Sequence, residues 1–143
     1  MNEKFQELIN ILQLVDIRFM DSHESVLHLP ENLSFGKEIS TESGQALANE
    51  DPVINENMLF FRVKYVFTFS CEKKPYFKTE YIVMISFKSA EVQKAAELLK
   101  DEELKKVFVE KQLNRTLWTI LRGTIMDAFN RHSLPPVQLP WIV

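Results

Sequence analysis

The sequence predicts an α+β fold in which a four-stranded antiparallel sheet is followed by a crossover and a long amphipathic helix. The main evidence is a change of hydrophobic period along the chain. Between Met58 and Phe87 apolar residues recur at every second position, as on a strand with one buried face. Beyond Phe87 the period is close to 3.6, as on an amphipathic helix. A length of 143 residues fits a single domain, which we expect to span residues 1–143.

A central hairpin is predicted on either side of the polar turn Glu72–Pro75. Apolar residues occupy odd positions before the turn and again after it, so one face of both strands is predicted to be buried. The even face is less polar than a solvated face, because it carries Met58, Phe60, Val66, Ile82 and Met84. We expect a partner subunit to cover that face, or the face to bind other chains.

Further strands are predicted ahead of the hairpin. Residues 3–20 open with a short irregular or helical lead, and β-branched residues then favour a strand over Ile9–Met20. The polar residues 21–25 are predicted to end that strand, and a weak strand follows at Val26–Leu29. The segment Leu33–Ala48 is poor in apolar residues, and we interpret it as a twisted or bulged strand at an edge.

Helices are predicted after the hairpin. Ser89 can cap a first helix with Val92 at its third position, and Asp101 can cap a short second helix. A long helix follows over roughly Val109–His132, with an apolar stripe wider than one contact surface requires. We therefore expect it to pack on its own sheet and on a second subunit. The candidate oligomer-interface residues are Leu117, Trp118, Leu121, Ile125 and Phe129.

Composition restricts the classes of partner. The net charge is −3, and Lys and Arg are scattered among Asp and Glu, so the chain lacks the basic patch that nucleic-acid binding requires. A single cysteine, Cys71, precludes an internal disulfide and indicates a reducing compartment, so we expect a cytoplasmic protein. Because the sequence shows neither a signal peptide nor a long apolar run, we expect no membrane insertion.

The residue patterns of common catalytic and metal sites are absent from the sequence. His23, His28 and His132 form no metal-ligand motif, and no GxSxG nucleophile elbow is present. Cys71 lies on the apolar strand face, where a small buried hydrophobic residue is the expected role. We therefore predict that the protein is not an enzyme and uses no metal or cofactor.

The sequence ends with LPPVQLPWIV, in which three prolines favour an extended path. Such dense apolar residues are expected to lie against another surface. That surface is either the chain's own long helix or a subunit or client.

The order of these elements resembles the SecB family of bacterial export chaperones. Three segments carry the resemblance: the strand NILQLVDIRF, the strand MLFFRVKYVFTF, and the helix from Leu117 followed by LPPVQLPWI. The last segment is similar to the family's proline-containing exit from its long helix. The resemblance covers most of the chain in order, as a pattern rather than as identity.

The resemblance implies a homotetramer built as a dimer of dimers, with long helices between sheets. It also implies hydrophobic grooves that hold unfolded or export-destined polypeptide without ATP. The candidate client-binding residues are Phe60, Val66, Ile82 and Met84 of the sheet, with Leu134, Val137, Leu139 and Trp141 of the C-terminal segment.

Two departures from the family alter these expectations. In the export chaperone a second helix and an acidic tail follow the proline segment and pass clients to the translocation motor, whereas this sequence stops at Val143. A stand-alone relative dedicated to one client, such as an antitoxin, therefore fits better. The crossover AEVQKAAELLKDEELKK is also more charged and more helical than the family's loop, so the groove shape is not carried over.

Two other hypotheses remain open at this stage. One is a small-molecule binding module, in which a curved sheet wraps the long helix around an apolar pocket for a lipid-like ligand. The other is an oligomeric interaction protein whose apolar surfaces are all used in self-assembly.

Overall fold

The computed structural model describes residues 2–29, 39–47, 52–135 and 139. Its elements follow the chain in the order α1 (Asn2–Ile11), β1 (Gln13–Val26), β2 (Ile39–Leu47), β3 (Val53–Asn55), β4 (Met58–Cys71), β5 (Lys74–Lys88), α2 (Val92–Leu98), α3 (Glu102–Val107), the π-helix η1 (Phe108–Leu113) and α4 (Asn114–Arg131).

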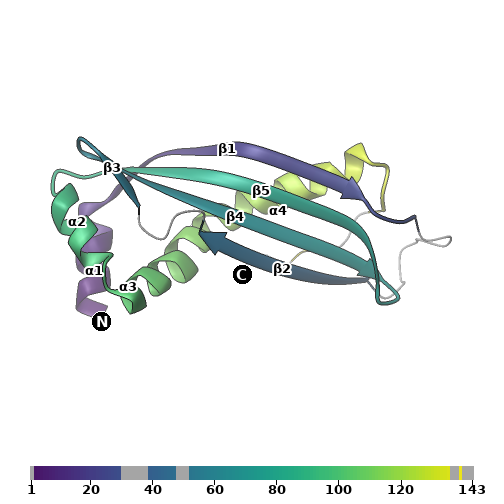
Figure 1. Ribbon diagram of the computed structural model, residues 1–143, viewed down its shortest axis with the longest axis horizontal. Coiled ribbons are helices and arrows are strands. Elements are labelled where there is room, and N and C mark those ends of the chain that lie inside the picture. Colours follow the sequence, from purple (N-terminus) through teal and green to yellow (C-terminus); the bar gives the residue numbers. More distant parts are fainter. Residues whose placement is uncertain (1, 30–38, 48–51, 136–138, 140–143) are drawn as a thin grey trace.

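The long strands form one antiparallel sheet in the order β1-β5-β4-β2, which confirms the predicted four-stranded sheet (Figure 1). The short strand β3 pairs with residues 58–60 at the start of β4, and β2 pairs with residues 63–71 of the same strand. The hairpin between β4 and β5 closes through Glu72 and Lys73, whose φ angles are 53° and 68°. Positive φ at both turn residues matches the right-handed twist of the flanking strands.

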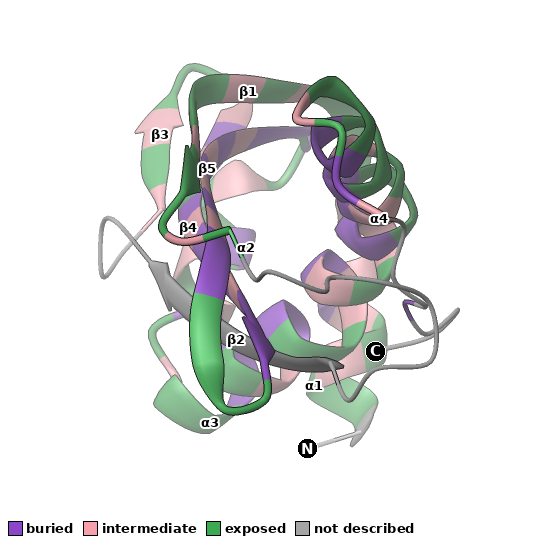
Figure 2. Cartoon of the chain, turned by 90° about the vertical axis from the view of Figure 1, so that its right-hand side faces the viewer, coloured by how far each residue is buried: buried purple, intermediate pink, exposed green. Residues whose placement is uncertain are grey.

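The odd positions of β4 and β5 form the buried face, as the period of two predicts. Aromatic side chains from this face meet the helix: Phe69 and Phe129 have ring centroids 4.8 Å apart, and Phe67 and Trp118 lie 6.0 Å apart. Figure 2 shows β1, β5 and β4 curving around one side of α4, with buried segments on β4, β5 and α4. The core therefore lies between the concave face of the sheet and the helix.

The predicted long helix begins earlier than expected. The helical path is continuous from Glu102 to Arg131, and six residues of π-helix separate α3 from α4 (Figure 1). The cap prediction at Asp101 is confirmed, because its Oδ1 accepts hydrogen bonds from the backbone N–H groups of Glu103 at 3.1 Å and Leu104 at 3.3 Å. The prediction for Ser89 is wrong: α2 begins at Val92 after Glu91, and the Ser89 hydroxyl accepts from the Glu91 N–H.

The first strand also differs from the prediction. The helical lead is confirmed as α1, but β1 runs from Gln13 through the polar residues 21–25 to Val26, and residues 27–29 form no strand. Pairing with β5 holds this polar stretch in the sheet, and register shifts after Leu14 and Phe19 accommodate it. The edge strand predicted over Leu33–Ala48 is present as β2 within its described part.

Candidate functional site

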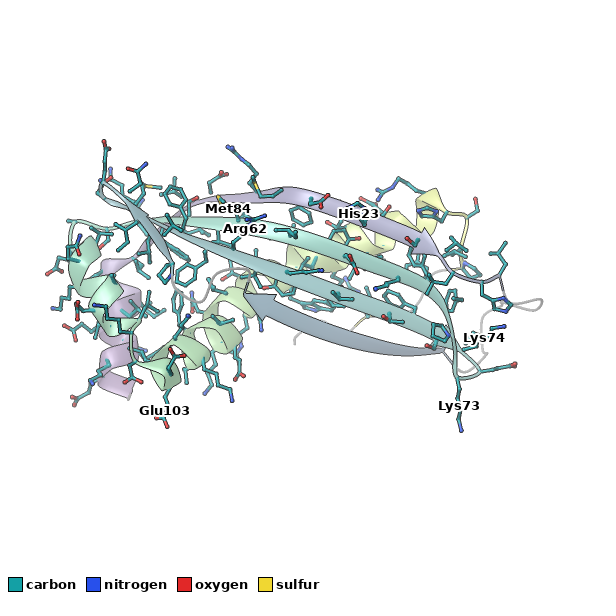
Figure 3. All side chains as sticks on the ribbon, viewed as in Figure 1. His23, Arg62, Lys73, Lys74, Met84 and Glu103 are labelled. Carbon is teal, nitrogen blue, oxygen red and sulfur yellow. The ribbon has the colours of Figure 1, made fainter. Side chains whose placement is uncertain are left out.

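The face of the sheet turned away from α4, which we call the outer face, carries the four predicted sheet residues. Phe60 and Val66 of β4 and Ile82 and Met84 of β5 are all half-buried. Cross-strand pairing places Met84 beside Arg62, as Figure 3 shows, and Ile82 beside Lys64. The structure therefore brings these four predicted residues onto one surface, which also carries the cations Arg62 and Lys64.

Several charges on the outer face neutralise one another. Lys78 and Glu80 form an ion pair at 2.9 Å, and the hydrogen bond from Lys78 is the main reason why the pKa of Glu80 lies below its usual value. On β1, Arg18 forms an ion pair with Asp16 at 3.4 Å, and His23 Nε2 lies within hydrogen-bond distance of Asp21 Oδ2, at 3.1 Å. These pairs are partly exposed, so each contributes little to stability.

The structure places the five predicted interface residues in the chain's own core. Leu117, Trp118, Leu121, Ile125 and Phe129 are all buried between α4 and the sheet. A direct contact with another subunit needs exposed side chains, which these five lack. The large apolar residues that α4 exposes are Ile120, at 41%, and Met126, at 42%. Any contact surface on this helix therefore has to include its outward face.

The two described C-terminal candidates, Leu134 and Leu139, lie on the α4 side of the sheet, away from the outer face. Leu134 and Leu139 are buried, whereas Val137 and Trp141 fall outside the described residues. Helix α4 ends in a Schellman motif: Leu134 donates its N–H to the Phe129 carbonyl, and Ser133, with φ of 55°, donates to Asn130. The chain then returns to α4, because Arg122 Nε donates to the Leu139 carbonyl at 3.4 Å.

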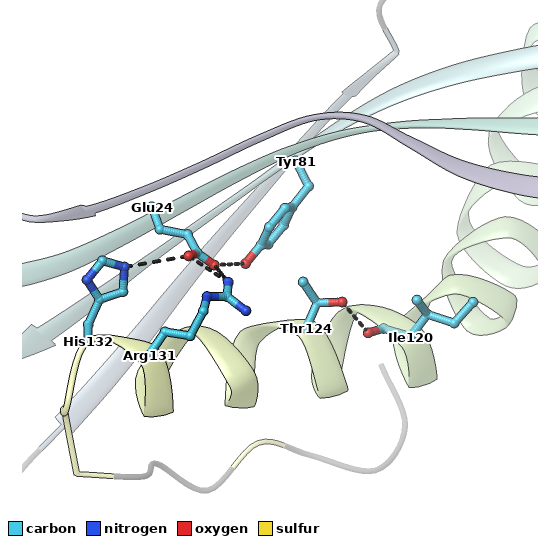
Figure 4. Close-up of polar contacts among 6 residues, drawn as sticks. All are labelled: Glu24, Tyr81, Ile120, Thr124, Arg131 and His132. Atoms are coloured by element: carbon cyan, nitrogen blue, oxygen red, sulfur yellow. Dashed lines mark hydrogen bonds and ion pairs between the residues drawn. The ribbon is translucent and has the colours of Figure 1, made fainter.

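A polar cluster at the end of α4 was not found from the sequence. The Glu24 side chain is only 13% exposed, and its Oε1 accepts a hydrogen bond from Arg131 Nη2 at 2.7 Å and lies 3.5 Å from His132 Nε2 (Figure 4). Tyr81 donates its hydroxyl to Glu24 Oε2 at 3.3 Å, and burial, assisted by this carboxylate, raises the pKa of Tyr81. This cluster joins the end of β1 to the end of α4.

The register shift after Phe19 explains why sequence reasoning missed Glu24. Ile17 and Phe19 pair with Ile85 and Val83, so odd residues of β1 lie toward the core before the shift. After it Glu24 pairs with Thr79, and even residues take the inward positions. A bulge leaves no clear sign in the hydrophobic pattern of this polar stretch.

Within the described residues, no group of three or more His, Cys, Asp or Glu side chains could hold a metal ion. None of the described helices is long and apolar enough to cross a membrane.

Comparison with known proteins identifies the fold. No protein-family model and no curated protein sequence matches the chain. A solved structure of the Mycobacterium tuberculosis Rv1957 SecB-like chaperone, in complex with a ChAD peptide from the Rv1956 HigA1 antitoxin, matches with a TM-score of 0.74. The fold is SecB-like. The match covers 97% of this chain and 96% of that one at 14% sequence identity, so the SecB-like likeness is one of fold. It confirms the resemblance predicted from the sequence.

Proposed function

We propose that this protein is an ATP-independent chaperone, a holdase, that binds unfolded polypeptide and serves one dedicated client such as an antitoxin. The observation that carries the proposal is the half-buried apolar group Phe60, Val66, Ile82 and Met84 on the outer face of a SecB-like sheet. Covering such partly exposed apolar groups with an unfolded chain removes them from water, which is favourable. The related structure, which holds an antitoxin peptide, supports a polypeptide client.

The proposal includes assembly into a dimer of dimers. A tetramer of this kind needs two different interfaces on each chain, each related by a two-fold axis. The chain offers two suitable surfaces: the outward face of α4, with Ile120 and Met126, and the edge of β1, the terminal strand of the described sheet. The β1 edge also exposes Leu14, Val15 and Met20. We place the protein in the cytoplasm, where its single buried cysteine would stay reduced.

A lipid-like ligand between sheet and helix is a weaker alternative. Phe61 lies 5.5 Å from Phe108 and 6.0 Å from Phe87 by ring centroid, and Phe77 lies 5.0 Å from Phe129. These rings fill the space that such a pocket would use. Native mass spectrometry of the purified protein tests the alternative, since a retained lipid would add its mass.

The first test measures mass by light scattering, and the suppression of aggregation when a denatured protein is diluted without ATP. We expect an oligomer that suppresses aggregation at stoichiometric amounts. Replacing Val66 or Met84 with Asp should weaken client affinity about five- to tenfold, because part of an apolar contact is lost and a charge is desolvated.

Gln93→Asp, which adds the same charge at an exposed position of α2, is the control. It should retain activity close to that of the unmodified protein. If the unmodified protein leaves aggregation unchanged at every ratio, the holdase proposal fails.

A further inference from the structure

The outer row of β4 has an ordered chemical pattern. Every second residue of a strand lies on the same face, so Phe60, Arg62, Lys64 and Val66 follow one another along that row. Two cations thus stand between two apolar residues. Met84 and Ile82 of β5 lie beside the two cations, which places both charges within an apolar surround.

Arg62 and Lys64 differ from Arg18 and Lys78 on the same face. Among the described side chains, Arg18 and Lys78 have carboxylate partners at 3.4 Å and 2.9 Å, whereas neither Arg62 nor Lys64 lies within ion-pair distance of a carboxylate. Lys64 acts on Glu80 only at longer range, where it helps to lower the pKa of that carboxyl group. The centre of the outer face therefore has an excess of positive charge on a chain whose net charge is −3.

An apolar client segment would be a poor match for this row. Covering the two cations with apolar groups would remove them from water without a compensating partner, which is unfavourable. A segment with basic residues would add repulsion between like charges. Carboxylates opposite the two cations would remove both penalties, and they would also select among clients.

We propose that the outer row of β4 binds an extended client segment in which two carboxylates, two residues apart, lie between apolar residues. The pattern is apolar-x-acid-x-acid-x-apolar, with the acids over Arg62 and Lys64 and the apolar groups over Phe60 and Val66. Extended chains rise about 3.3 Å per residue, so alternate residues of the client and of β4 repeat at the same distance. This inference rests on the proposed holdase function and specifies the client chemistry of the same surface.

The test uses two fluorescently labelled peptides and measures binding by anisotropy. One has the core Leu-Ser-Glu-Ser-Glu-Ser-Phe, and the other has Lys in place of both Glu residues. We expect the unmodified protein to prefer the acidic peptide by about tenfold at 0.1 M salt, equivalent to about 1.4 kcal/mol. The preference should shrink at 1 M salt, where the screening length falls from about 10 Å to about 3 Å.

Charge reversal provides the decisive comparison. The double variant Arg62→Glu/Lys64→Glu should reverse the preference toward the lysine peptide, whereas Lys111→Glu, at an exposed cation of η1, should leave it unchanged. If thermal unfolding shows that the reversed variant is not folded, Arg62→Gln/Lys64→Gln replaces it and should abolish the preference.

The aggregation assay on the same preparations separates the two proposals. Equal affinity for both peptides, or a preference that the charge substitutions leave unchanged, overturns the inference while aggregation suppression persists. If the unmodified protein does not suppress aggregation, the holdase function is overturned as well.

Discussion

Three buried tyrosines of the sheet have hydroxyl groups in different surroundings. Tyr65 donates to Asn114 Oδ1 at 2.9 Å, which links β4 to the start of α4, and Tyr81 donates to Glu24. The Tyr76 hydroxyl is buried without a hydrogen-bond partner among the described residues, and burial is the main cause that raises its pKa to about 12. A buried polar group stabilises the fold only where it has a partner.

This contrast predicts opposite effects of the same substitution. Tyr65→Phe should lower the free energy of unfolding by about 1 kcal/mol, because it leaves the Asn114 oxygen without this donor. Tyr76→Phe should leave stability unchanged or raise it by up to about 1 kcal/mol, because it removes only a desolvated hydroxyl. Urea unfolding of both variants beside the unmodified protein measures the difference. If Tyr76→Phe lowered the free energy of unfolding more than Tyr65→Phe does, the hydrogen-bonding environments described for the two hydroxyl groups would be wrong.

At the scale of elements, the hairpin turn is a clear site of backbone strain. Glu72 and Lys73 both adopt positive φ, which most residues with a Cβ atom disfavour. Glycine adopts it freely, and asparagine tolerates it better than glutamate or lysine does. Replacing the pair with Asn-Gly should therefore stabilise the protein by about 1–2 kcal/mol. The midpoint temperature of thermal unfolding should therefore rise. The control Ala-Ala at the same two positions should give no comparable increase. An unchanged midpoint for Asn-Gly would argue against a strained turn.

The accuracy of sequence reasoning differs between elements for physical reasons. The strands β4 and β5 alternate over most of their length, so their pairing and buried face were predicted correctly. Asp101 was recognised as a cap because its carboxylate acts on neighbouring backbone. In contrast, β1 depends on pairing with β5 and on two register shifts, which are set by distant residues rather than by its own pattern. Glu24 and its cluster were missed for that reason.

The predicted sites show the same division. The outer-face residues of β4 and β5 follow directly from the period of two, and the structure groups them as expected. The apolar stripe of α4 does not reveal which of its residues meet the chain's own sheet. The structure assigns Trp118 and Leu121 to that contact and leaves Ile120 and Met126 exposed. Sequence periodicity gives the width of the apolar stripe. Only the packed structure shows which of its residues contact the sheet and which remain exposed.

At the scale of the whole molecule, Gly123 provides a test of assembly. It lies three residues from both Ile120 and Met126 on the outward face of α4, and outside its own helix backbone no described heavy atom lies within 4 Å of where a Cβ would sit. A glycine inside a helix costs about 1 kcal/mol relative to alanine. Packing within the single chain does not explain why a glycine stands here. The close approach of a second helix would explain it, because only glycine leaves room for such a contact.

We therefore expect Gly123→Leu to disrupt assembly while the chain stays folded. A leucine side chain would hold two α4 helices apart at their crossing, so the mass measured by light scattering should fall to that of a smaller species, with an unchanged circular dichroism spectrum. Gln93→Leu, an added apolar group on the exposed surface of α2, is the control and should keep the original mass. If Gly123→Leu assembles normally, this face of α4 is not an interface. The glycine then lowers helix stability without contributing to assembly.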